Sequence, residues 1–399
     1  MRSRRRWMII GLAFVCLVAL ATVDWTVVRP RGTPAVLHAR SAAHAMLSAY
    51  EDSSLGMLDQ VAAPLGESYG SAAKTGTLFD VPVFAPTTVW DYSWALAAME
   101  DEAQLPGGKI FLPVVRVLTN NLQQYWDATA PVPAYAPSVH PGANAIKYFD
   151  DNAWVGLDLV TAYHLTGNRT YLERAESVFR YEESGWDPSG GGIYWNDQRL
   201  IRSTPSTAPV AELAVYLYRD TNNASYLAWA ERLYAWQEST LVVAATGEVL
   251  NSINAAGDVE TNMWTYNQGT VIGAGVLLYE VTHDRSYLTE ANRTAQYVLT
   301  DAMQSAGAFV AQPEFNGVLV DNLQLLYQAT GNRAVAKAIE TNAGLAWTNA
   351  RNAQGLIGPN WQGRAVPSSQ IPILTAGGGV RLMAVAASLA HGGFRGFWL

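Results

Sequence analysis

The sequence predicts an all-α protein in which six helical hairpins close into an (α/α)6 toroid, with long loops at the active-site mouth. Three observations lead to this fold class: a turn sequence that recurs along the chain, roughly six helical pairs, and a near absence of strand-like alternation. Helix pairs that repeat at this spacing either stack into an open solenoid or close into a ring. The number of pairs favours the ring.

The recurring turn joins two helices with the same physical logic in each copy. A helix ends shortly after a Leu-Tyr or similar pair, a Thr-Gly-Asn-type turn supplies a left-handed cap, and Thr or Ser caps the next helix. In the first copy, Thr170 and Glu173 have the spacing of a capping box. The anchoring tyrosines of the four copies are Tyr163, Tyr218, Tyr279 and Tyr327.

Further helices are expected on both sides of these four hairpins. Two helical pairs precede them, around residues 36–62 and 88–127, and a terminal helix follows around residues 379–391. Long loops rich in Gly, Pro, Asn and Trp separate the hairpins. They span residues 128–149, 182–204, 238–265, 301–316 and 350–372. Loops of this length inside a compact domain usually carry function, so we expect the site where they meet.

The composition limits the number of domains and the classes of partner that the chain can have. The chain has 399 residues, of which 49% are hydrophobic, and this is ample for a large core. Because the hairpins repeat throughout, we expect one domain over residues 31–399 rather than two or three. The net charge is −8 and no basic stripe is present, which argues against nucleic acid as a partner. A monomer is expected.

Residues 1–30 are typical of an export signal. A basic run over residues 2–6 precedes an apolar stretch over residues 7–23. This pattern fits a cleaved signal peptide, for which Ala19-Leu20-Ala21 offers a site, and it fits an N-terminal signal anchor equally well. Both predict an extracellular protein, either secreted or held at the plasma membrane by this segment alone. Cys16, the only cysteine, lies inside the segment, so no disulfide is expected in the exported part.

Two adjacent aspartates, Asp150 and Asp151, stand where a polar loop gives way to a helix. The loop before them is rich in Pro, Gly and Ser, and apolar residues recur at helical spacing from Trp154 onward. Asp150 is therefore expected at the N-cap and Asp151 at the first helical position, where the helix dipole favours a carboxylate. On spacing alone, the plainer interpretation is one capping Asp beside an incidental neighbour.

The strings around this pair change that interpretation, because several of them resemble glycoside hydrolase family 76. The three main strings are Tyr148-Phe149-Asp150-Asp151-Asn152-Ala153-Trp154, Trp264-Thr265-Tyr266-Asn267-Gln268-Gly269 and Phe315-Asn316-Gly317-Val318-Leu319-Val320. Shorter similarities lie at residues 191–195, 203–208 and 358–361, so the resemblance runs from about residue 88 to 390. The third string departs from the family, which usually has Lys at the position of Asn316.

The resemblance implies an (α/α)6 fold and a retaining endo-α-1,6-mannanase. By carry-over, Asp150 would be the nucleophile and Asp151 the general acid/base. In retaining enzymes the two carboxyls lie roughly 5–5.5 Å apart, and so close a pair shares one proton at working pH. The expected substrate-binding residues, whose rings and polar groups suit pyranose faces and hydroxyls, are Asn152, Tyr194, Trp195, Ser206, Tyr266, Asn267, Gln268 and Trp361.

Asp158 occupies a position that is expected to be small or apolar. It lies about two helical turns after Asp151 on nearly the same face. One hypothesis is that Asp158 raises the pKa of Asp151 or binds deeper in the funnel, and the plainer interpretation is an outward, solvated side chain. No metal and no cofactor are expected, since the six histidines lack paired spacing and no Gly-rich phosphate loop follows a strand.

Four functions remain to be separated. The leading one is an exported hydrolase of an α-1,6-mannan backbone. A transglycosidase of the same family type would use the same aspartates on mannose-containing glycans. A non-catalytic, membrane-anchored mannan-binding protein would use the aromatic cleft alone. Sugar epimerisation on a similar toroid generally relies on histidine pairs, and only His140 lies in a candidate mouth loop.

Overall fold

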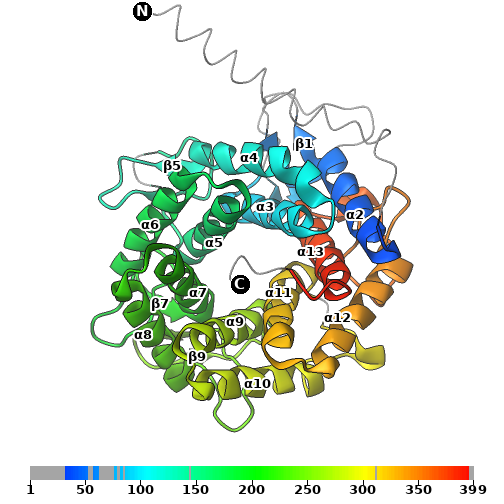
Figure 1. Ribbon diagram of the computed structural model, residues 1–399. Helices are drawn as coiled ribbons and strands as arrows, with labels where there is room; N and C mark the ends of the chain where they lie inside the picture. The colour runs from blue at the N-terminus through cyan, green and yellow to red at the C-terminus, as the bar shows by residue number, and fades with distance from the viewer. Residues whose placement is uncertain are drawn as a thin grey trace, which may run out of the picture.

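The computed structural model describes residues 32–52, 57–62, 76–78, 81–83, 86–142, 145–310 and 312–394. The expected export signal, residues 1–30, lies outside the described residues. Within them, paired helices follow one another around a ring (Figure 1). None of the helices that the structure describes is long and apolar enough to cross a membrane.

Six helices form the inner wall of this ring. They are α3 (Val89–Gln104), α5 (Phe149–Thr166), α7 (Thr204–Thr221), α9 (Thr265–Thr282), α11 (Pro313–Thr330) and α13 (Ile373–Leu389). Each contacts the next, and α13 returns to contact α3 (Figure 1). The ring is therefore closed, which confirms the predicted toroid and excludes an open solenoid.

The other six helices lie outside the inner wall. They are α2 (Pro34–Tyr50), α4 (Leu112–Asn121), α6 (Arg169–Ser184), α8 (Ala224–Thr240), α10 (Arg285–Thr300) and α12 (Arg333–Leu345). Five of these pack against the inner helix that precedes them in the chain, whereas α2 pairs with α13. The last predicted helix exists, but it begins six residues earlier than expected.

The predicted helical pair over residues 36–62 is wrong. Among the residues described in this range, only those of α2 are helical. The chain continues as β1 (Glu51–Asp52), which pairs antiparallel with β2 (Met57–Leu58). The intervening sequence contains two serines and Gly56, which favour a turn over a helix. The outer partner of α13 is thus supplied from the other end of the described chain.

The short turns between inner and outer helices confirm the left-handed caps that the recurring sequence predicts. The backbone N–H of the cap residue donates in every case to the carbonyl of the anchoring tyrosine. The caps are Gly167 (φ 70°), Asn222 (φ 55°), His283 (φ 60°) and Gly331 (φ 69°). The predicted Thr and Ser N-caps are wrong by two residues. The residues that cap the outer helices are Asn168, Asn223, Asp284 and Asn332.

Long loops return the chain from outer to inner helices at the opposite end, as predicted. They carry a three-stranded antiparallel sheet of β7 (Ile201–Ser203), β8 (Ser252–Asn254) and β9 (Val259–Glu260). Two further strand pairs are β5 (Trp126–Asp127) with β6 (Ala134–Tyr135), and β3 (Gly76–Leu78) with β4 (Val81–Val83). The remaining regular segments are short 3-10 helices at Gly108–Phe111, Leu122–Tyr125, Ser305–Gly307 and Ser368–Gln370, and a π-helix at Ala346–Ala350.

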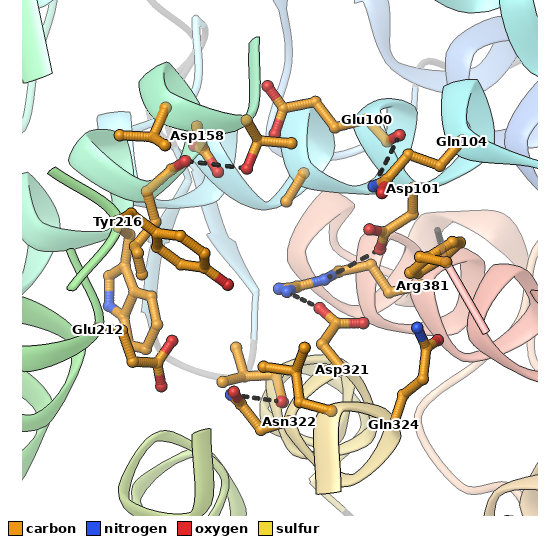
Figure 2. Close-up of a pocket in the computed structure, with 18 of the residues that line it drawn as sticks. Glu100, Asp101, Gln104, Asp158, Glu212, Tyr216, Asp321, Asn322, Gln324 and Arg381 are labelled. Atoms are coloured by element: carbon orange, nitrogen blue, oxygen red, sulfur yellow. Dashed lines mark hydrogen bonds and ion pairs between the residues drawn. The ribbon is translucent and has the colours of Figure 1, made fainter. Parts of the chain in front are cut away.

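An apolar layer divides the axis of the toroid into two compartments. Trp94, Trp154 and Val318 form this layer, with the two indoles edge to face at 5.1 Å between centroids. On the long-loop side, the layer packs against Trp90 and Tyr266, which line a cleft. On the other side, the layer itself lines a chamber into which several carboxyls and one guanidinium also project. Figure 2 shows these charged side chains.

Candidate active site

The cleft at the long-loop end has a volume of about 450 Å³. Its walls come from the long loops, the small sheet and the first residues of several inner helices. The lining residues are Thr88, Trp90, Pro137, Tyr148, Asp150, Asp151, Trp195, Ile201, Ser203, Pro205, Asn251, Glu260, Trp264, Tyr266 and Phe315. Of the described residues that line it, three are acidic and none is basic. The structure therefore brings the two predicted catalytic residues together with a ring of aromatic side chains.

Helix α5 places both aspartates at the cleft floor, although it begins earlier than predicted. Tyr148 is the N-cap, so Asp150 and Asp151 are the second and third helical residues, and neither caps the helix. The buried ring of Phe149 stacks on Tyr181 of α6 at 4.4 Å between centroids, which fixes the start of the helix one residue before the pair. Both residues are half-buried and line the cleft.

Asp150 accepts two hydrogen bonds that favour its ionised form. The Trp195 indole N–H donates to Oδ2 at 2.9 Å, and the backbone N–H of Asp151 donates to Oδ1 at 3.0 Å. Burial raises the pKa of Asp150 to about 7, against the lowering effect of these two donors. At neutral pH this carboxyl is balanced between its protonated and ionised forms.

Asp151 lies in a different environment, since no described group donates a hydrogen bond to its carboxyl. Burial holds the pKa of Asp151 well above its usual range, and the nearby carboxyls of Asp150 and Asp91 raise it further. The adjacent aspartates are thus electrostatically unequal. The surroundings of Asp151 favour its protonated form.

Two more buried carboxyls surround the pair. Asp91 accepts hydrogen bonds from Gln60 (2.7 Å) and Thr87 (3.0 Å), and burial raises its pKa to about 6. Glu182 of α6 is fully buried with neither carboxyl oxygen hydrogen-bonded, and burial with the charges of both dyad residues holds its pKa well above normal. Within the described chain, no Lys, Arg or His forms an ion pair with any of these four carboxyls, so the local field opposes ionisation.

The cleft contains a third lining carboxylate that sequence reasoning missed. Glu260 on β9 accepts hydrogen bonds from Asn251 (2.7 Å) and Ser252 (3.1 Å) at one oxygen and from Asn262 (2.9 Å) at the other. Asn267, a predicted substrate-binding residue, holds Asn251 in turn through a 3.0 Å bond. No signal in the sequence distinguishes Glu260 from a solvated loop residue, because the local β8–β9 hairpin that carries it is joined to β7, about fifty positions earlier in the chain.

Aromatic rings form the rest of the cleft wall. Trp195 is 39% exposed and packs its ring against Tyr148 at 5.1 Å. Across the cleft, Phe315 lies between Tyr266 (4.5 Å) and Trp264 (5.3 Å). Exposed ring faces beside carboxylates suit a ligand with flat apolar faces and hydroxyl edges, which is the chemistry of a pyranose.

Of the eight predicted substrate-binding residues, only Trp195 and Tyr266 line the cleft. Asn152 is buried and joins Tyr135 to the start of α5, donating to the carbonyls of Tyr135 and Tyr148 at 2.9 and 2.8 Å. Gln268 is buried and bonds both backbone groups of Val249. These two amides hold long loops onto inner helices, so they support the cleft rather than face it.

The other predicted binders also lie outside the cleft lining. Ser206 is buried, with its hydroxyl 2.9 Å from that of Ser203, which does line the cleft. Tyr194 faces Arg199 rather than the cleft. Trp361 is 4% exposed and belongs to the hydrophobic core, because its large indole fills space beneath the loop before α13. The expectation that it binds substrate directly is not met.

Two further positions singled out by the sequence are buried. Asn316 donates to the carbonyl of Val310 at 2.9 Å and does not line the cleft. Asp158 is 5% exposed, so the solvated interpretation is wrong, and it accepts a 2.5 Å hydrogen bond from Ser93. It lies beyond the Trp94–Trp154 layer and is not among the groups that raise the pKa of Asp151. Among the residues described, no three His, Cys, Asp or Glu are arranged to hold a metal ion.

Comparison with known proteins yields one family and several structures. The sequence profile of glycosyl hydrolase family 76 matches residues 41–365. Mannan endo-1,6-alpha-mannosidase DCW1 of Saccharomyces cerevisiae is 28% identical over 151 residues, which are 33% of this chain and 34% of that protein. Its DFG5 counterpart is 30% identical over 131 residues, 29% of this chain and 28% of that protein. The matches thus span about a third of each relative.

Solved structures match over nearly the whole described chain. A family 76 mannosidase of Bacteroides thetaiotaomicron has a TM-score of 0.80 at 22% identity, covering 90% of this chain and 99% of that one. An inactive α-1,6-mannanase variant of Salegentibacter, solved with α-1,6-mannotriose, has a TM-score of 0.73 at 23% identity, covering 88% and 99%. Dfg5 of Chaetomium thermophilum, solved with glucosamine, has a TM-score of 0.70 at 18% identity, covering 90% and 91%.

Proposed function

Because the chain belongs to glycosyl hydrolase family 76, we propose that it is a retaining, endo-acting glycosidase that cleaves α-1,6-linked mannan through a glycosyl-aspartate intermediate. The observation that carries this proposal is the inequality of the two adjacent aspartates at the floor of an aromatic cleft. One carboxyl accepts donors that favour its charge, and the other has no donor and keeps its proton. A retaining glycosidase needs this division of labour.

The proposed reaction has two steps. Asp150, ionised with the support of the Trp195 N–H, attacks the anomeric carbon, while Asp151 gives its proton to the departing O6 of the next mannose. Asp151, now ionised, then takes a proton from water as that water attacks the same carbon. The bond to Asp150 breaks, the sugar leaves with its original configuration, and both carboxyls return to their starting states.

The cleft supports a neutral glycan as the substrate. Trp195, Trp264 and Tyr266 offer rings on which mannose faces would stack, and Glu260 offers a fixed acceptor for hydroxyls. With no basic lining residue among those described, nothing in the cleft favours phosphate, sulfate or carboxylate substituents. The similarity to yeast mannan endo-1,6-alpha-mannosidases and the fold shared with a mannotriose-bound mannanase support α-1,6-mannan in particular.

Transfer to another sugar is the second candidate function. The glycosyl-aspartate formed in the first step would react with a sugar hydroxyl in place of water, with no change in either carboxyl's role. The fold shared with Dfg5, which was solved with glucosamine, is compatible with this candidate. Product analysis with and without an added acceptor glycan separates the two: hydrolysis gives new reducing ends, whereas transfer gives longer products at their expense.

An extracellular location follows from the proposed substrate, because mannans are wall and surface polymers. Residues 1–30 would direct export or anchor the protein at the plasma membrane. Contact with the membrane would then be confined to that segment, and the toroid would act as a monomer on polysaccharide.

Linear α-1,6-mannan tests the proposal directly. The wild type should release mannooligosaccharides, and the first-formed anomer seen by NMR should be α. Asp150→Asn and Asp151→Asn should each lose activity by about a thousandfold or more, since each removes an essential charge or proton. Asp284→Asn is the matched control, because Asn already caps the equivalent helix in the other three hairpins.

Three results would contradict the mechanism. Full activity in either dyad variant would remove the dyad from catalysis, and a first-formed β anomer would make the enzyme inverting. If the wild type bound the sugar but formed no product, either alone or with an added acceptor, the non-catalytic binding protein would be favoured. Calorimetry with mannotriose on the folded variants measures that binding.

A further inference from the structure

The chamber beyond the Trp94–Trp154 layer is a second cavity, separate from the cleft. Helices α3, α5, α7, α11 and α13 supply its walls, and its accessible volume is about 170 Å³. A single water needs roughly 10–15 Å³ of such volume, so the chamber has room for a molecule of several heavy atoms. Among the residues described, Phe394, His164 and Gln328 also line it.

The charges that line the chamber are out of balance. Five carboxyls face one guanidinium, and Figure 2 shows Arg381 reaching in between Asp101 and Asp321. Arg381 forms ion pairs with both of these, at 3.6 Å to Asp101 and closer to Asp321. No described cation forms an ion pair with the remaining carboxyls, which are Glu100, Asp158 and Glu212.

Two of these carboxyls also lack hydrogen bonds. Glu100 is 2% exposed and Glu212 is 5% exposed, and Oε1 of each is buried without a partner. An unpaired buried acceptor destabilises the folded protein, and it does so more strongly when it is charged. In Figure 2, Glu212 lies opposite the Arg381 group, beside Tyr216. These oxygens are acceptors that the described protein leaves unused.

A glycine of the neighbouring inner helix lies beside Glu212. It is Gly273 of α9, and a Cβ at this position would lie 2.7 Å from Glu212 Oε1 and 1.8 Å from Asn322 Oδ1. The glycine therefore allows two acceptors to approach each other. No described group donates a hydrogen bond to Glu212 Oε1, so its donor would be a proton or a ligand.

We propose that this chamber is a second binding site, for a small organic cation that carries primary ammonium groups. An ammonium donates three hydrogen bonds and supplies the positive charge that Glu100, Asp158 and Glu212 lack. The indoles of Trp94 and Trp154 and the ring of Tyr216 offer apolar and cation–π contact to its methylene chain and head groups. The carboxyls surround a volume rather than converge on a point, which suits an organic ion rather than a metal.

Occupancy should depend on pH, because protons compete for the same oxygens. Burial raises the pKa of Asp158 to about 7, and it holds the pKa values of Glu100 and Glu212 well above normal. The other titratable or charged groups that face the chamber are Asp101, His164, Tyr216, Asp321 and Arg381. His164 is paired with Asp220 at 2.8 Å. Binding of a cation should therefore strengthen as the pH rises through about 7.

Isothermal titration of the full chain with 1,4-diaminobutane at constant ionic strength tests the proposal. The wild type should bind one diamine saturably near pH ~8 and about tenfold more weakly near pH ~5.5. The double variant Asp158→Asn/Glu212→Gln should lose about tenfold or more at the higher pH. Glu231→Gln/Glu340→Gln removes the same formal charge from exposed outer-helix positions and should bind normally.

Two further variants locate the bound diamine and remain informative if the charge variant fails to fold. Ala97→Leu fills the chamber without changing charge and should also abolish binding. Asp150→Asn/Asp151→Asn leaves the chamber intact and should bind as the wild type does. The proposal is overturned by an absence of saturable binding near pH ~8, by undiminished binding in Ala97→Leu, or by loss in the dyad or outer-helix variants.

Discussion

A single indole N–H distinguishes the surroundings of the two dyad residues. Trp195 donates to Asp150 and to no atom of Asp151, so it favours the ionised form of Asp150, whereas burial and the neighbouring carboxyls favour the protonated form of Asp151. The same ring is 39% exposed in the cleft. One side chain thus tunes the nucleophile and offers a surface to the sugar.

Replacing this indole should shift the pH profile. In Trp195→Phe, the pKa of Asp150 should rise above about 7, because a donor that favours the ionised form is lost. The acidic limb of kcat/KM should therefore move to higher pH, by about one unit. Trp264→Phe is the control, since it alters stacking without touching Asp150. An unmoved limb in Trp195→Phe, or an equal shift in Trp264→Phe, would disprove the assigned role.

At the residue scale, the sequence predicts which strings form the site better than it predicts which of their side chains line the cleft. The Asp150–Asp151 pair, Trp195 and Tyr266 reach the cleft as expected. Asn152 and Gln268 belong to the same recognisable strings, yet they bond backbone groups inside the protein. A sequence string that a family shares can contain residues that support the cleft as well as residues that line it. The two are distinguished only when the direction of each side chain is known.

At the element scale, the short turns are the best-predicted parts of the fold. Their geometry depends on four or five consecutive residues, so local sequence is sufficient to specify it. The predicted N-caps differ from the observed ones because Asn and Asp also cap helices. Here the capping Asn and Asp residues stand two positions before the Thr and Ser. The small sheet was missed, because β7 and β8 pair across a whole hairpin.

The left-handed caps make a stability prediction. Asn222 and His283 adopt positive φ, which strains a residue with a Cβ, so Asn222→Gly and His283→Gly should stabilise the protein by roughly 0.5–1 kcal/mol each. Gly167→Ala and Gly331→Ala should destabilise it by about 1 kcal/mol, since an added Cβ meets nothing within 4 Å and only the backbone is strained. Urea unfolding midpoints measure both pairs. If both pairs of variants shifted the unfolding midpoint in the same direction, backbone strain at the left-handed caps would not explain the shifts.

At the scale of the whole molecule, the toroid buries several acids whose pKa values are raised. Burial raises the pKa of Asp91 to about 6, of Asp158 to about 7 and of Glu102 to about 8. Each value lies above that of an unfolded chain, so the stabilising contribution is complete below about pH 4 and is lost as the pH rises through the folded value. The free energy of unfolding should consequently fall between about pH 5 and pH 8.

Thermal unfolding across that range checks this expectation. The midpoint should decrease as the pH rises, and Glu102→Gln should flatten the decrease, because it replaces a fully buried acid with a neutral group. Glu340→Gln, on the exposed face of α12, should leave the slope unchanged. A midpoint that is constant or rises towards pH ~8 would show that these acids ionise freely in the folded protein.

The pairing of α2 with α13 has a consequence for how the protein is made. Among the described helices, α2 is synthesised first and α13 last. The apolar face of α2, which includes Val36, Ala39 and Met46, therefore has no partner helix until synthesis is nearly complete. Ring closure is therefore a late, long-range event, which slows folding and leaves apolar surface open to chaperones or aggregation. Circular permutants opened at a short turn and joined between α13 and α2 would make these helices neighbours in translation.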